Sequence, residues 1–165
     1  MFDHRRKVGL VTSSALIGLG LVLASCSPSD RGERIVEVTH GPVTAVLVDA
    51  APEGASVGDV RYFSIMTAGT GGAGRLEAIL STTGMDVPEP TTEVRVGQLV
   101  FTFAEGQVSV LGASVYPSAG STIAVGATTV RPVVGGSGEF AGVTGWCEST
   151  RNDDDTWVHV LHLQG

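Results

Sequence analysis

Lysine is almost absent from this chain of 165 residues, in which Lys7 is the only one. Residues 26–165 contain seven arginines and sixteen acidic residues, so their formal net charge is −9. The whole chain has a net charge of −7, because residues 1–25 add three basic residues and one acidic residue. Such an acidic chain is poorly suited to nucleic acid, whose phosphates are neutralised by Lys and Arg. The absence of lysine after residue 7 also excludes lysine Schiff-base chemistry there.

Cysteine is scarce as well, with only Cys26 and Cys147. Cys26 ends a Leu-Ala-Ser-Cys segment that follows a basic stretch, 5–7, and an apolar run, 8–23. This order is typical of a secretory signal peptide, and the run is short for a membrane span of about 20 residues. The ending resembles the lipobox of bacterial lipoproteins, in which the cysteine is acylated. We therefore expect residues 1–25 to be a lipoprotein signal peptide and lipid on Cys26 to anchor the protein to the membrane outside the cytoplasm.

The remainder is long enough for one domain with one sizeable core. Residues 26–33 are mostly polar, and we expect them to be a tether that precedes a domain at 34–165. With lipid on Cys26, Cys147 has no partner for an intrachain disulfide. A lone cysteine in an apolar stretch is usually a small buried hydrophobe.

Sustained helical periodicity with caps is lacking in this domain. Instead, runs rich in Val, Ile and Thr recur at short intervals between Gly, Pro, Asn and Asp, which is typical of a sandwich or barrel of hairpins. Closure of an antiparallel sheet removes its exposed edges, so we predict an all-β fold, an eight-stranded antiparallel closed β-barrel. Such a barrel is either filled by side chains or holds one small ligand. The expected strands are 35–48, broken at Gly41-Pro42, then 59–67, 75–83, 93–103, 107–116, 122–134, 142–150 and 156–163.

Motifs for metals and nucleophiles are lacking too. Asp153 to Asp155 are consecutive, without the alternation of a calcium loop, and indicate a solvated turn. His159 and His162 are three apart in a strand and point to opposite faces, so we expect His159 to pack beside Leu161 instead of binding metal. Ser137 lies between two glycines without the context of a nucleophile elbow. We expect no metal and no organic cofactor.

Three segments carry a family resemblance. Residues 106–112 (GQVSVLG) and 134–145 (VGGSGEFAGVTG) resemble a strand and a glycine-rich turn and strand of allene oxide cyclases and dirigent proteins. Val57-Gly58-Asp59 followed by Phe63 is similar to their G-D-x-x-x-F strand. The three segments occur in the family order and cover most of the chain from Gly58 onward.

The resemblance implies an eight-stranded barrel with an apolar interior that works without metal or organic cofactor. Allene oxide cyclases close a ring on a fatty-acid epoxide, dirigent proteins direct coupling of phenolic radicals, and similar bacterial barrels perform Diels–Alder-type closures. We therefore expect a hydrophobic small molecule as the partner. A homo-oligomer, dimer or trimer, is compatible with the resemblance.

Candidate catalytic residues follow from the family's acidic residues. The Glu of the first family strand corresponds to Glu37 by pattern or to Asp49 by its distance from Gly58-Asp59, and both remain open. Asp59 is a third acid, which either faces the cavity or caps a turn. Tyr62 either donates a phenol into the cavity or is an interface aromatic.

Candidate substrate-binding residues are Arg61 and Arg75, nearest by position to the arginine of dirigent cavities, and Tyr116.

Two functions remain open. One is a cofactor-free cyclase or isomerase that folds a flexible polyketide-like or fatty-acid-like molecule in the barrel, with an interior acid whose pKa burial raises. The alternative is a lipoprotein that only binds such a molecule outside the membrane. A filled interior would instead indicate a structural module.

Overall fold

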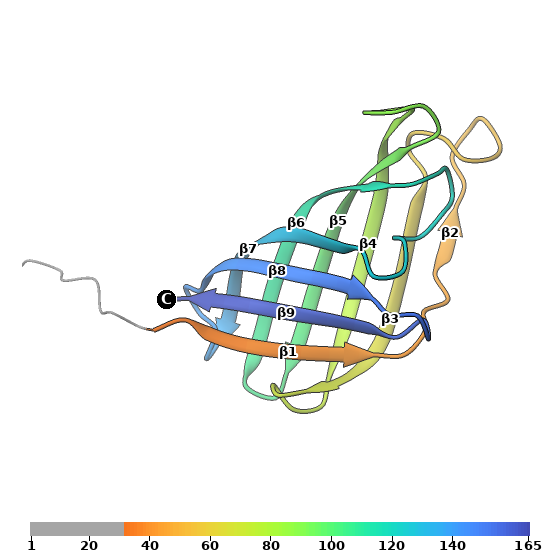
Figure 1. Ribbon diagram of the computed structural model, residues 1–165. Coiled ribbons are helices and arrows are strands. Elements are labelled where there is room, and N and C mark those ends of the chain that lie inside the picture. Colours follow the sequence, from red (N-terminus) through yellow and green to blue (C-terminus); the bar gives the residue numbers. More distant parts are fainter. Residues whose placement is uncertain (1–31) are drawn as a thin grey trace, which may run out of the picture. The chain divides into compact units, whose positions relative to one another are not determined.

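The computed structural model describes residues 32–165, which form nine strands and no helix (Figure 1). The predicted signal peptide, the lipid site at Cys26 and most of the tether lie outside the described residues. Within 32–165 there is no helix that could span a membrane. The strands are β1 (Arg34–His40), β2 (Val46–Val48), β3 (Val60–Gly69), β4 (Gly74–Met85), β5 (Glu93–Phe103), β6 (Gly106–Tyr116), β7 (Thr128–Gly138), β8 (Thr144–Arg151) and β9 (Trp157–Gln164).

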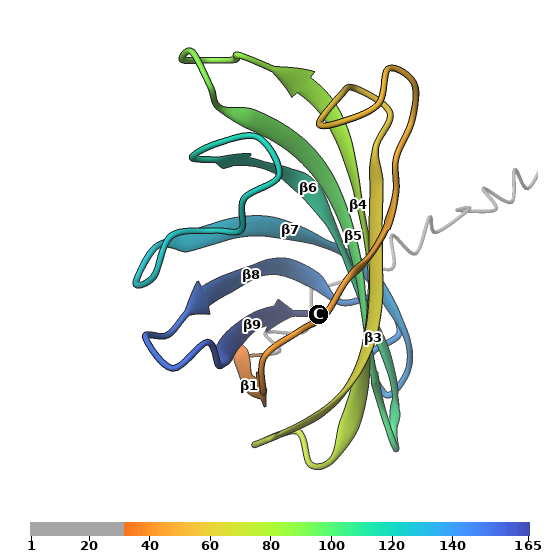
Figure 2. The ribbon, with the colours of Figure 1, turned by 90° about the vertical axis from the view of Figure 1, so that its right-hand side faces the viewer.

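The sheet closes into a barrel. From β3 to β9 each strand pairs antiparallel with the next, and β9 pairs with β1. Closure occurs where β1 also pairs with β3, with Val38 opposite Gly69 and Thr39 opposite Ala68. Figure 2 shows β3 to β5 and β7 to β9 curving around opposite sides of one interior. Eight strands therefore form the predicted closed barrel, and the short β2 pairs with the start of β3, along the same edge of β3 that meets β1 at its end.

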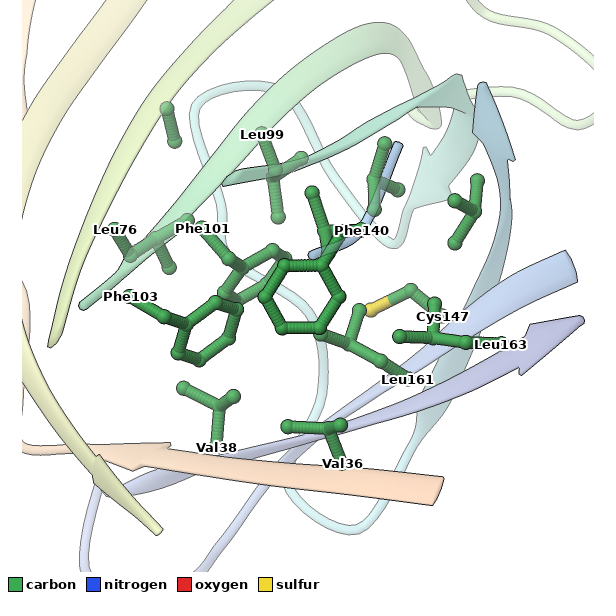
Figure 3. Packing of buried hydrophobic residues seen from close by; sticks show 14 residues of the cluster. Val36, Val38, Leu76, Leu99, Phe101, Phe103, Phe140, Cys147, Leu161 and Leu163 are labelled. Carbon is green, nitrogen blue, oxygen red and sulfur yellow. The ribbon is translucent and has the colours of Figure 1, made fainter. Parts of the chain in front are cut away.

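Side chains alternate between the interior and the outside, and the interior changes character along the barrel. On β5 the inward residues run from Glu93 and Arg95 at the start of the strand to Phe101 and Phe103 at its end. The apolar end is filled by a cluster from almost every strand (Figure 3). Its largest buried members include Phe101, Phe140, Leu76, Leu161 and Leu163. The polar residues therefore gather at the opposite end of the interior.

The predicted strands are confirmed apart from the one before Gly135. We expected a strand at 122–134 and a glycine-rich turn after it, but β7 runs from Thr128 to Gly138. Gly135 to Gly138 pair with the start of β6, and the turn follows at 139–143. A Cβ on Gly136 would collide with the backbone oxygen of Phe140, so glycine permits this close approach. Residues 122–127 belong to a loop instead.

Cys147 is buried in the core and has no disulfide, as the sequence predicted for a small hydrophobe. Burial raises the pKa of its thiol to about 11. The thiol is therefore neutral and unreactive at physiological pH.

Candidate functional site

The polar end of the barrel holds a cavity of about 400 Å³. Loop residues from 42–45, from 120–123 and from the β8–β9 hairpin contribute to its wall, which places it at one end of the barrel. Much of the wall is apolar and includes Leu47, Phe63, Leu80, Leu99, Ile123 and Trp157. The interior is thus divided between a solid core and a space that can enclose a small molecule.

Glu93 organises one side of this cavity. Its carboxylate is completely buried and accepts hydrogen bonds from Arg95 Nε at 2.7 Å and Arg95 Nη2 at 2.6 Å. It also accepts from Arg61 Nη1 at 3.1 Å, from the Gly120 N–H at 2.8 Å and from the Thr82 hydroxyl. All its oxygen lone pairs are therefore engaged by the protein.

The pKa of Glu93 is shifted downward, whereas we expected an upward shift for an acid in the barrel interior. Burial raises it, but the hydrogen bonds from Arg95, Thr82 and the Gly120 N–H outweigh burial and lower it to about 2. Glu93 is therefore ionised at neutral pH and saturated with donors. It is an anchor for its neighbours and not a proton donor for a substrate.

Arg95 connects this anchor to the loop at 117–127. Its Nη1 donates to the Ser121 carbonyl at 2.8 Å, and its guanidinium lies over the ring of Tyr116 at 3.9 Å from the centroid. Arg151 Nη1 donates to the Ile123 carbonyl at 3.0 Å. These bonds hold the loop in the wall of the cavity.

A second polar group consists of Ser149, His159 and His40. His40 Nδ1 lies 2.7 Å from the Gly41 carbonyl, which only accepts, so the proton of neutral His40 is on Nδ1. His40 Nε2 is then an acceptor, and His159 Nε2, 3.0 Å away, must donate to it. His159 Nδ1 in turn accepts from the Ser149 hydroxyl at 2.8 Å. The hydrogen bonds thus run in one direction from Ser149 to Gly41.

Both imidazoles are neutral in this pattern, in agreement with the direction of their pKa shifts. Burial, followed by electrostatic interaction with His40 and Arg131, lowers the pKa of His159 to about 3. Burial also lowers the pKa of His40. At neutral pH the pair therefore presents polar atoms without charge.

Arg131 differs from the other arginines of the cavity. Its side chain is 4% exposed, and it lines the cavity from β7. Nη1 donates to Thr129 Oγ1 at 3.0 Å, whereas the buried Nε has no hydrogen-bond partner. Gly97 and Gly112 leave room for it, since a Cβ on Gly97 would lie 3.2 Å from Nε and a Cβ on Gly112 3.2 Å from Cγ.

The structure brings two of the predicted site residues into the cavity. Arg61 and Tyr116 both line it. Asp59 is buried but is not part of the cavity wall, because its carboxylate accepts from the N–H groups of Ala50 at 3.0 Å and Ser56 at 3.1 Å. These bonds lower the pKa of Asp59 and match the turn-capping alternative.

Four further predicted residues lie outside the cavity. Glu37 is exposed because it alternates with the inward Val36 and Val38 on β1. Asp49 is exposed beyond the end of β2 and accepts from the Gly54 N–H at 3.1 Å. The remaining two face outward from β3 and β4: Tyr62 is 44% exposed, and the exposed Arg75 pairs with Glu77 at 3.7 Å.

Sequence reasoning missed Glu93, Arg95, Arg131, Ser149 and His40 as site residues. A signal was present on the strand from 93 to 103, where Glu93 and Arg95 alternate onto the same face as Leu99, Phe101 and Phe103. His159 was correctly placed on the face of Leu161, but its hydrogen bonds depend on strands distant in sequence. Within residues 32–165 no three His, Cys, Asp or Glu side chains form a group that could hold a metal ion.

No family model and no curated protein matches the chain. Solved structures do. Pyocyanin demethylase is similar with a TM-score of 0.60 and 18% identity over 81% of this chain and 100% of that one. The exo-specific intermolecular Diels-Alderase AbnU has a TM-score of 0.60 and 13% identity over 81% and 99%, and the pterocarpan synthase dirigent protein GePTS1 has 0.53 and 16% over 87% and 98%.

The chain shares the eight-stranded barrel fold of these proteins, one of which is a dirigent protein. This confirms the architecture that the three sequence segments implied. At these identities the likeness establishes the fold and not the chemistry of the cavity.

Proposed function

We propose that this barrel is a cofactor-free cyclase or isomerase that folds a flexible, largely apolar small molecule inside its cavity. The observation that carries the proposal is the cavity of about 400 Å³ above a solid core, with an apolar wall and a few fixed polar groups. A Diels-Alderase, a demethylase and a pterocarpan synthase are among the solved proteins with this fold, which supports small-molecule chemistry as its use.

The apolar wall supplies the first part of the mechanism. Leu80 and Leu99 on one side and Trp157 on the other line a space in which a flexible chain must fold back on itself. Binding in a folded conformation holds the reacting atoms close together. The entropy cost of ordering the chain is then met on binding, and ring closure is faster. The core beneath, with Phe101 packed edge-on against His159 at 5.2 Å between ring centroids, makes the floor rigid.

The polar groups supply the second part. Arg131 supplies a donor that no group in the described part of the chain uses, and the neutral Ser149–His159–His40 chain, whose own donors are all engaged, adds fixed dipoles on the cavity wall. Such fixed dipoles stabilise charge that develops on a carbonyl oxygen during the reaction. The expected interior acid with a raised pKa is replaced by these groups, because the carboxylate of Glu93 is already saturated.

One observation favours the carrier alternative. Glu93, His40 and His159 all have pKa values shifted away from neutrality, so none of them is poised for proton transfer near pH 7. A binding protein needs no such group, whereas a cyclase of this kind must work by folding and polarisation alone.

The experiment that separates the two functions uses a synthetic linear precursor, an apolar chain with a conjugated diene and an alkene that also closes slowly without protein. Purified protein and precursor are incubated, and the rate and stereochemistry of conversion are compared with a protein-free control. A cyclase gives faster conversion and one predominant stereoisomer. A carrier binds the precursor and leaves both quantities unchanged.

Anchoring through lipid on Cys26 is a separate part of the proposal. The Leu-Ala-Ser-Cys segment supports it. A lipoprotein cysteine carries a diacylglycerol on its sulfur and a fatty acid on its amine. These are more than one acyl chain, and a single chain is too few for stable anchoring. The barrel would then take its ligand at the outer face of the membrane.

A further inference from the structure

Arg131 is a buried cation whose charge is left without a carboxylate. Within residues 32–165 it takes part in no ion pair, and its one hydrogen bond is to the neutral hydroxyl of Thr129. Its Nε is buried with no partner at all. Burying a cation in this way is destabilising unless an anion compensates it.

The acids near the cavity are engaged elsewhere. Glu93 is held by Arg95 and Arg61, at 2.6 Å and 3.1 Å. Asp155, which lines the cavity, accepts from Arg151 Nε at 3.0 Å. Neither carboxylate is free to pair with Arg131, so its charge has no carboxylate partner in the described part of the chain.

Arg95 provides the contrast within the same cavity. It has the surroundings of a structural arginine: a two-pronged ion pair, a backbone carbonyl and an aromatic ring beneath it. Arg131 has none of these, although it is equally buried. The neighbouring Gly97 and Gly112 leave space for its side chain in the cavity wall.

We propose that the cavity selects small molecules that carry an ionised oxygen acid, such as a carboxylate or an enolate, and that Arg131 pairs with this group. The inference rests on the proposed function in assuming that the cavity takes up a small molecule. The acidic head lies at Arg131 and the apolar remainder lies along the wall formed by residues such as Leu80, Leu99 and Trp157. Arg131 would thereby fix the orientation in which the chain folds.

Two probes of equal chain length test this selection, decanoate and 1-decanol, titrated calorimetrically at pH 8 into the barrel from residue 27 onward. We expect decanoate to bind at least tenfold more tightly than decanol, and Arg131→Met to abolish the difference. Arg131→Lys should retain part of it, because the positive charge remains. Arg75→Met is the matched control, since Arg75 is exposed on the outside of β4 and should leave the ratio unchanged.

A stability measurement separates this role from a structural one. If Arg131 awaits a ligand, Arg131→Met should melt at the same temperature as the wild type or higher without ligand, because an unpaired buried charge is removed. A lower melting temperature together with an unchanged preference for decanoate would overturn the inference. Equal affinity of the wild type for both probes would also overturn it, yet would leave uptake of apolar molecules by the cavity intact. If neither probe binds, both the inference and the proposed function fail.

Discussion

His40 and His159 share one hydrogen bond between their Nε2 atoms, which are 3.0 Å apart inside the barrel. Two imidazoles can form this bond only when at least one of them is unprotonated at Nε2. The Gly41 carbonyl only accepts, which places the proton of neutral His40 on Nδ1; His159 then donates from Nε2, and the Ser149 hydroxyl donates to His159 Nδ1. Protonation of both rings at Nε2 therefore breaks the bond between them.

This pair predicts loss of stability in mild acid. The folded-state pKa of His159 is about 3, below its ordinary value of 6.5, so the unfolded chain binds the extra proton between these limits. The free energy of unfolding should therefore fall as pH drops below 6.5, by about 1.4 kcal/mol per pH unit from this group. Urea unfolding at pH 7.5 and pH 5 measures the change. His159→Gln should show a smaller decrease, and equal decreases in both proteins would contradict the assignment.

Glu93 predicts a different dependence on pH. Removing its charge with Glu93→Gln leaves Arg95 and Arg61 without their anion, and we expect a loss of about 3–5 kcal/mol in the free energy of unfolding at pH 7. The folded-state pKa is below the ordinary 4.5, so this contribution is full above pH 4.5 and fades as pH falls toward 2. The difference between wild type and variant should therefore shrink from pH 7 to pH 3. A constant difference would show that the ion pair is not its source.

Replacing Asp59 should destabilise the fold without changing the reaction in the cavity. Its carboxylate holds the segment from Ala50 to Ser56 and does not line the cavity. Asp59→Ala should lower the melting temperature by about 5 °C and leave the rate of precursor conversion per folded molecule unchanged. Conversion that falls while the melting temperature holds would return Asp59 to the catalytic residues.

A methyl group added at Gly97 should weaken ligand binding in the cavity. A Cβ there would lie 2.9 Å from Leu80 Cδ2 and 3.2 Å from Arg131 Nε, and both side chains line the cavity. Gly97→Ala should therefore displace them and weaken decanoate binding by about tenfold. Gly84→Ala is the control, because its Cβ would make only an ordinary contact of 3.5 Å with Val94. Similar affinities for the two variants would argue against this geometry.

Membrane anchoring is tested by labelling cells with an alkyne fatty acid. Wild-type protein should acquire the label and partition into the membrane fraction, and Cys26→Ala should do neither. Cys147→Ala is the control, since the Cys147 thiol is buried in the core. Equal labelling of wild type and Cys26→Ala would exclude the lipid site.

Much of the fold follows from local features of the sequence. Alternation along 93–103 and 107–116, with turn residues between them, was enough to place β5 and β6, whose observed bounds are within one residue of the expected ones. The later start of β7 has a physical reason. Ile123 and Val125 are typical strand residues and favoured a strand at 122–127. The backbone instead turns at 124–127, and Ile123 lies in the cavity wall.

The site was less accessible to sequence reasoning because its contacts join distant strands. His40 and His159 are 119 residues apart, and nothing near either of them in sequence indicates the other. Of the acids chosen by resemblance, Glu37 faces outward because alternation along β1 turns Val36 and Val38 inward, and Asp49 lies in the loop after β2, where it accepts from the Gly54 N–H. Arg61 was found because its neighbours carry the Gly58-Asp59 motif.

The most direct test of the account is the stereochemical outcome of precursor conversion by wild type and by Ala78→Phe, which fills the cavity from β4. If the barrel templates the reaction, wild type should give faster conversion and one predominant stereoisomer, and Ala78→Phe should approach the rate and isomer mixture of the protein-free control while remaining folded. Tight binding of the precursor by wild type, with a rate and isomer mixture identical to those of the protein-free control, would contradict it.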